Sequence, residues 1–334
     1  MTRLSPAALI PLLVVIVCAA IPFLTPSQSW LGLAINTVLI GLLGIAWNIT
    51  GGFGGLMSFG HAALFGAGAY ASAMLQIHLA WSAWIAALAG IAAAAAMGGI
   101  IGALSFRRGL RGSSFALITL AFAEVLRILA SSFEITGAGQ GLALPLRPGM
   151  AHLQFADRLT AYGFVLGLAV IALAISVAVR LSRFGAYLIA VRENEEAAKA
   201  LGIDTFRVKL MAMLLSGAIA GVAGVAYLQI YLFVDAPIAF GPTMSVEALL
   251  GPIIGGAGTL LGPVIGTVLL HMLGEAVKGM TGGAAGLNLV LYGVLLLVIL
   301  RFLPDGIIGL ANAGNGGPRW FWRKSAPIVP AEAV

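Results

Sequence analysis

Hydrophobic residues are grouped into long runs that short polar segments separate. A helix needs about 20 apolar residues to cross a bilayer, so apolar runs of about 18 or more residues predict membrane spans. Nothing along the chain alternates with the period of two that an outer-membrane β-barrel requires. The pattern predicts spans at residues 7–24, 30–48, 55–77, 82–105, 113–133, 160–181 and 208–234, a broken region at 245–275, and a last span at 286–303.

The runs must be helical, because lipid offers no hydrogen-bond partner to an unpaired backbone. The predicted fold is therefore all-α, a polytopic transmembrane helical bundle of about ten membrane segments that include broken or re-entrant helices. A composition of 60% hydrophobic and 9% charged residues excludes a soluble globular domain. We divide the chain into a transmembrane domain at 1–304 and a tail at 305–334.

The broken region contains a short internal repeat. LLGPIIG at 249–255 recurs as LLGPVIG at 260–266. Proline removes a backbone donor and glycine weakens a helix, so the repeat predicts breaks at Gly251, Pro252, Gly262 and Pro263. We expect two half-spans or a re-entrant pair of helices here.

The basic residues predict the topology. The net charge is +6, and Lys and Arg are spread over short loops, which is typical of the cytoplasmic side of a membrane protein and not of a nucleic-acid-binding surface. If Arg3 is cytoplasmic, alternation places 107–111 and 180–209 inside and 134–159 outside. The basic C-terminal part is also inside only if 245–275 crosses the membrane an even number of times. We therefore expect both termini in the cytoplasm.

One segment concentrates charge. Residues 183–209 carry nine of the thirty charged side chains. Within this segment, RENEEAAKALGI at 192–203 places charges first, then two alanines, then Gly202 followed by an apolar residue. A glycine in that position is typical of a helix end. The pattern predicts a short, water-facing helix that ends at Gly202.

Glycines are dense between residues 48 and 75, where polar side chains are Asn48, Ser58, His61 and Tyr70. Glycine permits close helix packing, and it also permits a broken helix that lines a pathway. Both interpretations stay open for these four residues. The other histidines lack the spacing of metal ligands, so no metal site is predicted.

Glu124 and Arg127 lie within an apolar run at a spacing of i,i+3. Lone charges in a membrane are costly, so these two should pair with each other. We expect an interior ion pair. It would either hold the bundle together or contact a zwitterionic or carboxylate substrate.

The sequence carries no motif for ATP binding or for nucleophilic catalysis. No lysine follows a glycine, so the phosphate-binding pattern G-x-x-x-x-G-K-[ST] is absent. We expect neither an enzyme nor a bound cofactor, and any ATP that drives the protein must bind to partner subunits.

Several segments together resemble a known family. Glu196, Ala197, Ala198 and Gly202 match E-A-A-x-x-x-G, the cytoplasmic signature of permease subunits in bacterial ABC importers. SFGHAALFGAGAY at 58–70, ALITLAFAEVLRI at 116–128, TGAGQGL at 136–142 and EALLGPIIGGAGTLLGPVIG at 247–266 look like branched-chain amino acid permeases of the LivM type. The resemblance covers about residues 35–305. It departs from the family pattern at Ala138, where the family often has glycine.

The resemblance implies a permease that carries branched-chain or other hydrophobic amino acids across the bacterial inner membrane. It also implies that this permease works with a sister LivH-like permease, two ABC ATPase subunits and a periplasmic substrate-binding protein. The same resemblance implies that the helix ending at Gly202 is the coupling helix that contacts an ATPase. The residues assigned to this contact are Glu193, Glu195, Glu196, Ala197, Ala198, Lys199 and Gly202.

Two alternatives remain at this point. Similar permeases serve urea, short amides and aromatic acids, so the substrate is open. An ion-coupled secondary transporter or channel would also fit the composition and the broken helices. That second class would transport as a single gene product.

Overall fold

The computed structural model describes residues 27–281, 290, 293–294, 297, 301–302 and 306–313. The predicted span 7–24 and most of 286–303 therefore lie outside the described residues. The helices are α2 (Gln28–Trp47), α3 (His61–His78), α4 (Ala83–Arg107), α5 (Gly112–Ser132), α6 (Arg158–Leu181), α7 (Arg183–Glu193), α8 (Glu195–Ala200), α9 (Thr205–Tyr231), α10 (Ala236–Phe240), α11 (Pro242–Gly255), α12 (Gly262–Thr281) and α14 (Gly306–Ala313).

Short elements complete the described chain. A π-helix η1 (Asn48–Phe53) continues α2, and two 3-10 turns η2 (Glu134–Thr136) and η3 (Met150–His152) lie between α5 and α6. Two-residue strands β1 (Leu142–Ala143) and β2 (Phe233–Val234) pair antiparallel, with Leu142 opposite Val234. These two strands are the small exception to the all-α prediction within the described residues.

Six stretches of the described chain are long and apolar enough to cross a membrane. One of them joins α2 to η1 and another joins α10 to α11. The all-α polytopic prediction is confirmed, whereas the number of ten segments stays a prediction. The predicted span 55–77 is wrong at its start, because α3 begins only at His61. Gly54 ends η1 and Gly55 adopts φ +64°, a conformation that interrupts a helix.

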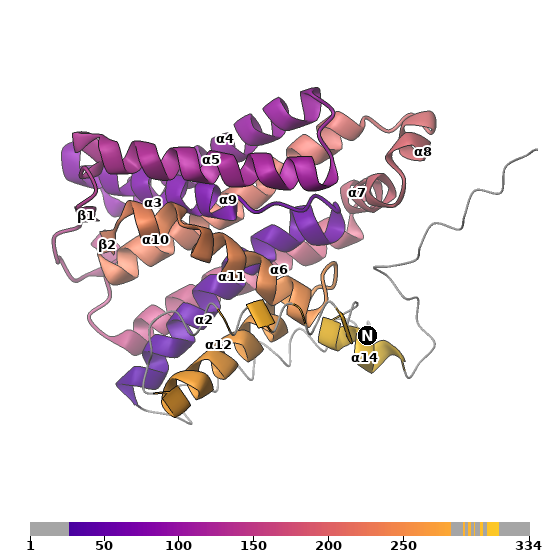
Figure 1. Cartoon of the computed structure of the whole chain (residues 1–334). Helices are drawn as coiled ribbons and strands as arrows, with labels where there is room; N and C mark the ends of the chain where they lie inside the picture. Colours follow the sequence, from indigo (N-terminus) through magenta and orange to yellow (C-terminus); the bar gives the residue numbers. More distant parts are fainter. Residues whose placement is uncertain are drawn as a thin grey trace, which may run out of the picture.

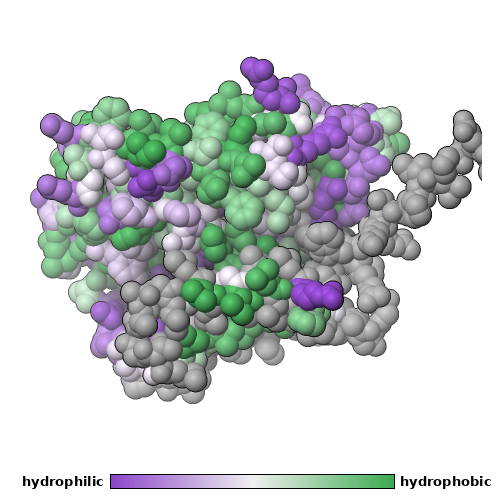
Figure 2. Space-filling view, in the orientation of Figure 1, coloured by the Kyte–Doolittle hydropathy of each residue, from purple (hydrophilic) through white to green (hydrophobic). Residues whose placement is uncertain are grey.

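The bundle has two distinct ends (Figure 1). We call the end that carries α7, α8 and the 108–111 loop the charged end, and the end that carries β1 and β2 the hairpin end. Figure 2 shows hydrophilic residues gathered at the two ends, with a mostly hydrophobic surface between them. The basic segments 107–111 and 180–209 share the charged end, as the alternation of spans predicts.

Helix α4 packs closely against both α3 and α9 through small residues. A Cβ atom on Gly90 of α4 would lie 2.6 Å from the Gly68 carbonyl oxygen of α3, and one on Gly217 of α9 would lie 2.6 Å from the Ala94 carbonyl oxygen. A Cβ on Gly98 would likewise meet the Met213 carbonyl oxygen, and one on Gly221 would meet the Ala94 side chain at 2.5 Å. Lipid gives helices no hydrophobic reason to associate, so this close backbone approach supplies the packing energy.

We predict that Gly98→Ala destabilises the protein by about 1–3 kcal/mol, because the added methyl would overlap the Met213 backbone carbonyl. Gly163→Ala in α6 is the matched control, since a Cβ there meets nothing within 4 Å. Thermal denaturation in detergent should show a lower midpoint for Gly98→Ala alone. Equal midpoints for the two variants would contradict the packing described here.

The broken region forms an antiparallel pair, α11 and α12. A Cβ on Gly255 would touch Gly262, and a Cβ on Gly251 would touch Thr267, so the two helices run side by side in opposite directions. This antiparallel arrangement agrees with the expected re-entrant pair of helices, whereas the even number of membrane passes at 245–275 stays a prediction, because α11 but not α12 belongs to a stretch that is long and apolar enough to cross a membrane.

The position of the break differs from the prediction. Helix α11 continues through Gly251 and Pro252 and ends at Gly255, while Gly262 and Pro263 begin α12. The interruption lies at 256–261, where Gly256 has φ +120° and Gly258 has φ +81°. Pro252 lies inside α11, where its missing N–H removes one hydrogen bond of the helix, whereas Pro263 lies in the first turn of α12, where no backbone donor is needed.

Both prolines also serve packing. A Cβ on Gly44 of α2 would lie 3.3 Å from the Pro252 ring and 3.5 Å from Pro263. The predicted tail at 305–334 begins with α14, whose Gly306 lies against Gly256 at the turn between α11 and α12. Residues 314–334 lie outside the described residues.

Candidate functional site

Two short helices at the charged end form the candidate site, and side-chain caps set their limits. The Ser182 hydroxyl accepts a hydrogen bond from the Gly185 N–H at the start of α7. The Asn194 side chain accepts from the N–H groups of Glu196 and Ala197, each at 3.0 Å, and so begins α8. Asn194 itself is extended, with φ −157° and ψ 104°, which separates α8 from α7.

Helix α8 ends in a Schellman motif. The Ile203 N–H donates to the Ala198 carbonyl at 3.1 Å, and the Gly202 N–H donates to the Lys199 carbonyl at 2.9 Å. Gly202 has φ +83°, a left-handed conformation that glycine adopts without steric cost. The sequence prediction of a helix that ends at Gly202 is confirmed.

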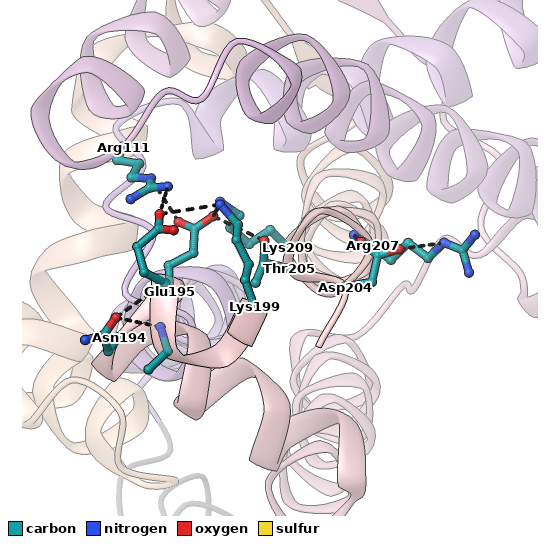
Figure 3. A network of polar contacts seen from close by, with 10 residues as sticks. Arg111, Asn194, Glu195, Lys199, Asp204, Thr205, Arg207 and Lys209 are labelled. Atoms are coloured by element: carbon teal, nitrogen blue, oxygen red, sulfur yellow. Dashed lines mark hydrogen bonds and ion pairs between the residues drawn. The ribbon is translucent and has the colours of Figure 1, made fainter. Parts of the chain in front are cut away.

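Glu195 connects α8 to the rest of the charged end (Figure 3). Its carboxylate accepts hydrogen bonds from Lys209 Nζ at 2.8 Å and from the Thr205 hydroxyl at 3.2 Å, both on α9. It also pairs with Arg111 Nε at 3.0 Å and with Lys199 Nζ at 3.3 Å. One carboxylate thus joins α8 to α9 and to the segment before α5.

Lys209 is the most buried member of this network. Its side chain is only 5% exposed, and its Nζ lies 5.1 Å from the centre of the Phe106 ring. A buried ammonium group is costly without a carboxylate partner, and an aromatic face adds a weaker attraction. Glu195, whose side chain is 14% exposed, supplies that partner.

Two opposing effects act on the pKa of Glu195. Burial raises it, but the hydrogen bond and charge of Lys209 and the charge of Arg111 outweigh burial, so the pKa lies below its usual value. The contribution of Glu195 to stability is therefore complete above the unfolded carboxyl pKa of about 4.3 and is lost only as the pH falls through the lower folded value. The network should persist at neutral pH.

The other residues predicted for ATPase contact divide between two faces. Ala198 is buried, together with the inward carboxylate of Glu195. Glu193, Glu196, Ala197, Lys199 and Gly202 are exposed. Glu195 therefore anchors α8 from the inner side, although the sequence analysis assigned it to the outer contact. The outer face of α8 is exposed among the described residues.

Leu201 was missed by the sequence analysis. Its side chain is 82% exposed at the tip of α8, immediately before Gly202. A single exposed apolar side chain is common on protein surfaces, so this exposure makes Leu201 accessible to a partner protein but does not by itself indicate one. Its signal in the sequence is an apolar residue directly before the glycine that ends a charged helix.

The four polar residues of the glycine-dense segment are buried within the bundle. Asn48, Ser58, His61 and Tyr70 are at most 3% exposed. The His61 ring lies 2.9 Å from the Ser216 hydroxyl through Nε2 and 3.2 Å from the Ser58 hydroxyl through Nδ1. Tyr70 stacks on Phe240 with ring centres 5.3 Å apart. These contacts support the packing interpretation, and a pathway role for the four residues stays a prediction.

Glu124 and Arg127 form the predicted ion pair in α5, with Arg127 Nη2 2.5 Å from Glu124 Oε1. The pair is not interior, however. The Glu124 side chain is 46% exposed and that of Arg127 is 32% exposed within the described residues. Figure 2 shows a hydrophilic patch in the region of α5, within the hydrophobic band. The expectation of an interior pair is therefore corrected.

Comparison with known proteins gives consistent matches. Residues 29–300 match the family described as "Branched-chain amino acid transport system / permease component". The chain is 28% identical to the high-affinity branched-chain amino acid transport system permease protein LivM of Salmonella typhimurium, over 89% of this chain and 74% of the relative.

Two further relatives come from Escherichia coli K12. The LivM protein is 29% identical, with the same coverage. The LivH permease protein is 28% identical over 80% of this chain and 90% of the relative. No solved structure gives a significant match.

Proposed function

Since this chain belongs to the family of permease components of branched-chain amino acid transport systems, we propose that it is one permease subunit of an ATP-driven importer. It is a multi-pass membrane protein, and its relatives are transport permeases and not enzymes. Its similarity to both LivM and LivH supports pairing with a sister permease of the same fold.

The observation that carries the proposal is the construction of α8. Its inner side is tied to α9 and to Arg111 through Glu195, while Ala197, Lys199 and Leu201 are exposed on its outer side. A rigid helix held in this way transmits a push better than a loop does. Because this sequence has no phosphate-binding loop, we place the ATP on two separate ATPase subunits, one of which docks on α8.

The exposed ion pair of α5 supports a place for the substrate. A charged pair on a membrane helix is costly in lipid, so this face meets protein or water instead. We place the sister permease opposite α5 and the substrate pathway between the two subunits. Glu124 and Arg127 then face a zwitterionic amino acid, whose ammonium and carboxylate groups they complement.

The charged end supports an orientation for the protein. Basic segments favour the cytoplasmic side, so we place α7 and α8 in the bacterial cytoplasm and β1 and β2 at the periplasmic face. Trp30, in the first turn of α2, and Trp81 and Trp84, around the start of α4, are exposed, and exposed aromatic residues suit the lipid headgroup region. A periplasmic binding protein delivers the substrate to the hairpin end. Branched-chain amino acids are the substrate class that the relatives' names support.

Transport by purified complexes tests the proposal. The chain is reconstituted in proteoliposomes with its sister permease, ATPases and binding protein, and uptake of radiolabelled leucine is measured. Uptake should require ATP on the ATPase side and should disappear when the ATPases are omitted. Leucine uptake by this chain alone, driven by a sodium or proton gradient without ATP, would overturn the proposal in favour of a secondary transporter.

A further inference from the structure

The glycine-dense segment after α2 provides a packing surface for α7. A Cβ on Gly54 would lie 3.0 Å from the Leu188 side chain, and a Cβ on Gly55 would lie 2.5 Å from Cγ of Arg192. Leu188 is fully buried in this position. The absence of side chains at 54 and 55 therefore lets the helix that precedes α8 rest directly on the end of η1.

Arg192 binds the end of that same membrane helix. Its Nη1 donates a hydrogen bond to the Gly52 carbonyl at 2.6 Å. Carbonyl groups in the last turn of a helix lack partners within the helix and carry partial negative charge, which a cation stabilises. The Arg192 side chain is only 10% exposed, so this contact lies beneath α7 and not on its outer surface.

The turn between α11 and α12 also packs against η1. Asn48 Nδ2 donates to the Thr259 carbonyl at 2.8 Å, and the Gly258 N–H donates to Asn48 Oδ1 at 2.8 Å. A Cβ on Gly52 would lie 2.6 Å from the Gly258 nitrogen. Two hydrogen bonds from one side chain thus fix the turn 256–261 to the first residue of the π-helix.

Arg192 also reaches this turn. A Cβ on Gly258 would lie 3.0 Å from Arg192 Nη1. One guanidinium group, carried by α7, therefore bonds to the end of η1 and lies next to Gly258 in the turn of the broken pair. A π-helical turn inside a membrane span is uncommon, and such turns occur often at functional sites.

We propose that Arg192 is a positioning residue that carries movement of the α7–α8 element into η1 and the α11–α12 pair. The inference rests on the proposed function, because the movement comes from ATPases docked on α8. This role requires close and rigid packing of α7 and of the turn 256–261 against η1, because a flexible contact would absorb the displacement. Gly52, Gly54 and Gly55 permit the close packing, and Asn48 holds the turn 256–261 against η1. Arg192 connects α7 to η1.

The experiment uses the complete transporter complex and measures ATP hydrolysed per leucine taken up. Arg192→Gln should raise this ratio by about fivefold or more, the size of a typical coupling free energy between two sites. Arg183→Gln is the matched control, because Arg183 is exposed on the same helix, about 13 Å earlier along its axis. An unchanged ratio in Arg192→Gln would overturn the inference.

Two further variants separate positioning from folding. Arg192→Lys keeps a cationic donor for the Gly52 carbonyl and should restore most of the coupling. Asn48→Ala should also raise the ratio of ATP hydrolysed to leucine taken up. The effects of Arg192→Gln and Asn48→Ala should be less than additive, because both residues act on the same contact region at η1. Additive effects with no rescue by lysine would contradict the claim that Arg192 and Asn48 act together on η1.

The outcome also distinguishes this inference from the proposed function. If wild-type complexes fail to take up leucine with ATP, the proposed function is wrong and the ratio is undefined. If wild-type uptake is ATP-driven and Arg192→Gln loses its ATPases during purification, the residue acts in assembly and the inference is overturned.

Discussion

Replacing Gly202 by valine is expected to abolish ATP-driven uptake. Valine at φ +83° is strained by about 1–3 kcal/mol, because its branched Cβ conflicts with the backbone in the left-handed region. Helix α8 has only six residues and ends in the Schellman motif that Gly202 completes. The strain should therefore unwind its last turn and displace Leu201. ATPase subunits recovered with the purified permease give the direct measurement.

Gly202→Asn is the control for this prediction. Asparagine tolerates the left-handed conformation better than other residues with a side chain, and a Cβ at this position meets nothing within 4 Å in this chain. We expect Gly202→Asn to keep the ATPases and most of the uptake. Full uptake by the valine variant would show that the end of α8 plays no part in coupling.

Replacing Glu195 by glutamine is expected to loosen α8 by about 3 kcal/mol, because it leaves the buried ammonium group of Lys209 without its carboxylate. Local opening of α8 should become about 100-fold more frequent, which speeds trypsin cleavage after Lys199 by a similar factor. The cleavage rate at neutral pH is the measurement.

The adjacent Glu196→Gln is the matched control. That carboxylate is 67% exposed and pairs with Arg111 at the surface, so its loss should cost no more than about 1 kcal/mol. Lys209→Met in the Glu195→Gln background should recover part of the protection, since it removes the uncompensated charge. Equal cleavage rates for the two glutamine variants would mean that Glu195 is not the anchor of α8.

Local patterns predicted much of the fold. The apolar runs predicted the limits of α4, α5, α6 and α9 to within a few residues, because a membrane helix can be recognised from its local composition. Gly202 was recognised as a helix end because a Schellman motif depends on a local residue preference. The LLGP repeat predicted a pair of helices in the region 245–275, and α11 and α12 form that pair.

Contacts between distant segments were not predictable in the same way. Glu195 looked like its neighbour Glu196, and only the fold places Lys209 and Arg111 on its inner side. The break lies at 256–261, where Gly256 and Gly258 adopt positive φ, and not at Gly251 and Pro252, which the repeat indicated but which lie inside α11. The exposure of the Glu124 pair likewise depends on how few helices cover α5.

The most direct test of the central claim is crosslinking from α8 in the purified, transport-active complex. Cys18, the single cysteine of the sequence, is replaced, and a photoreactive label is attached to Ala197→Cys on α8 or to Leu146→Cys, an exposed position between α5 and α6. The label at 197 should capture an ATPase subunit, and the label at 146 should not. Capture of the ATPase from position 146, or from neither position, would contradict the account.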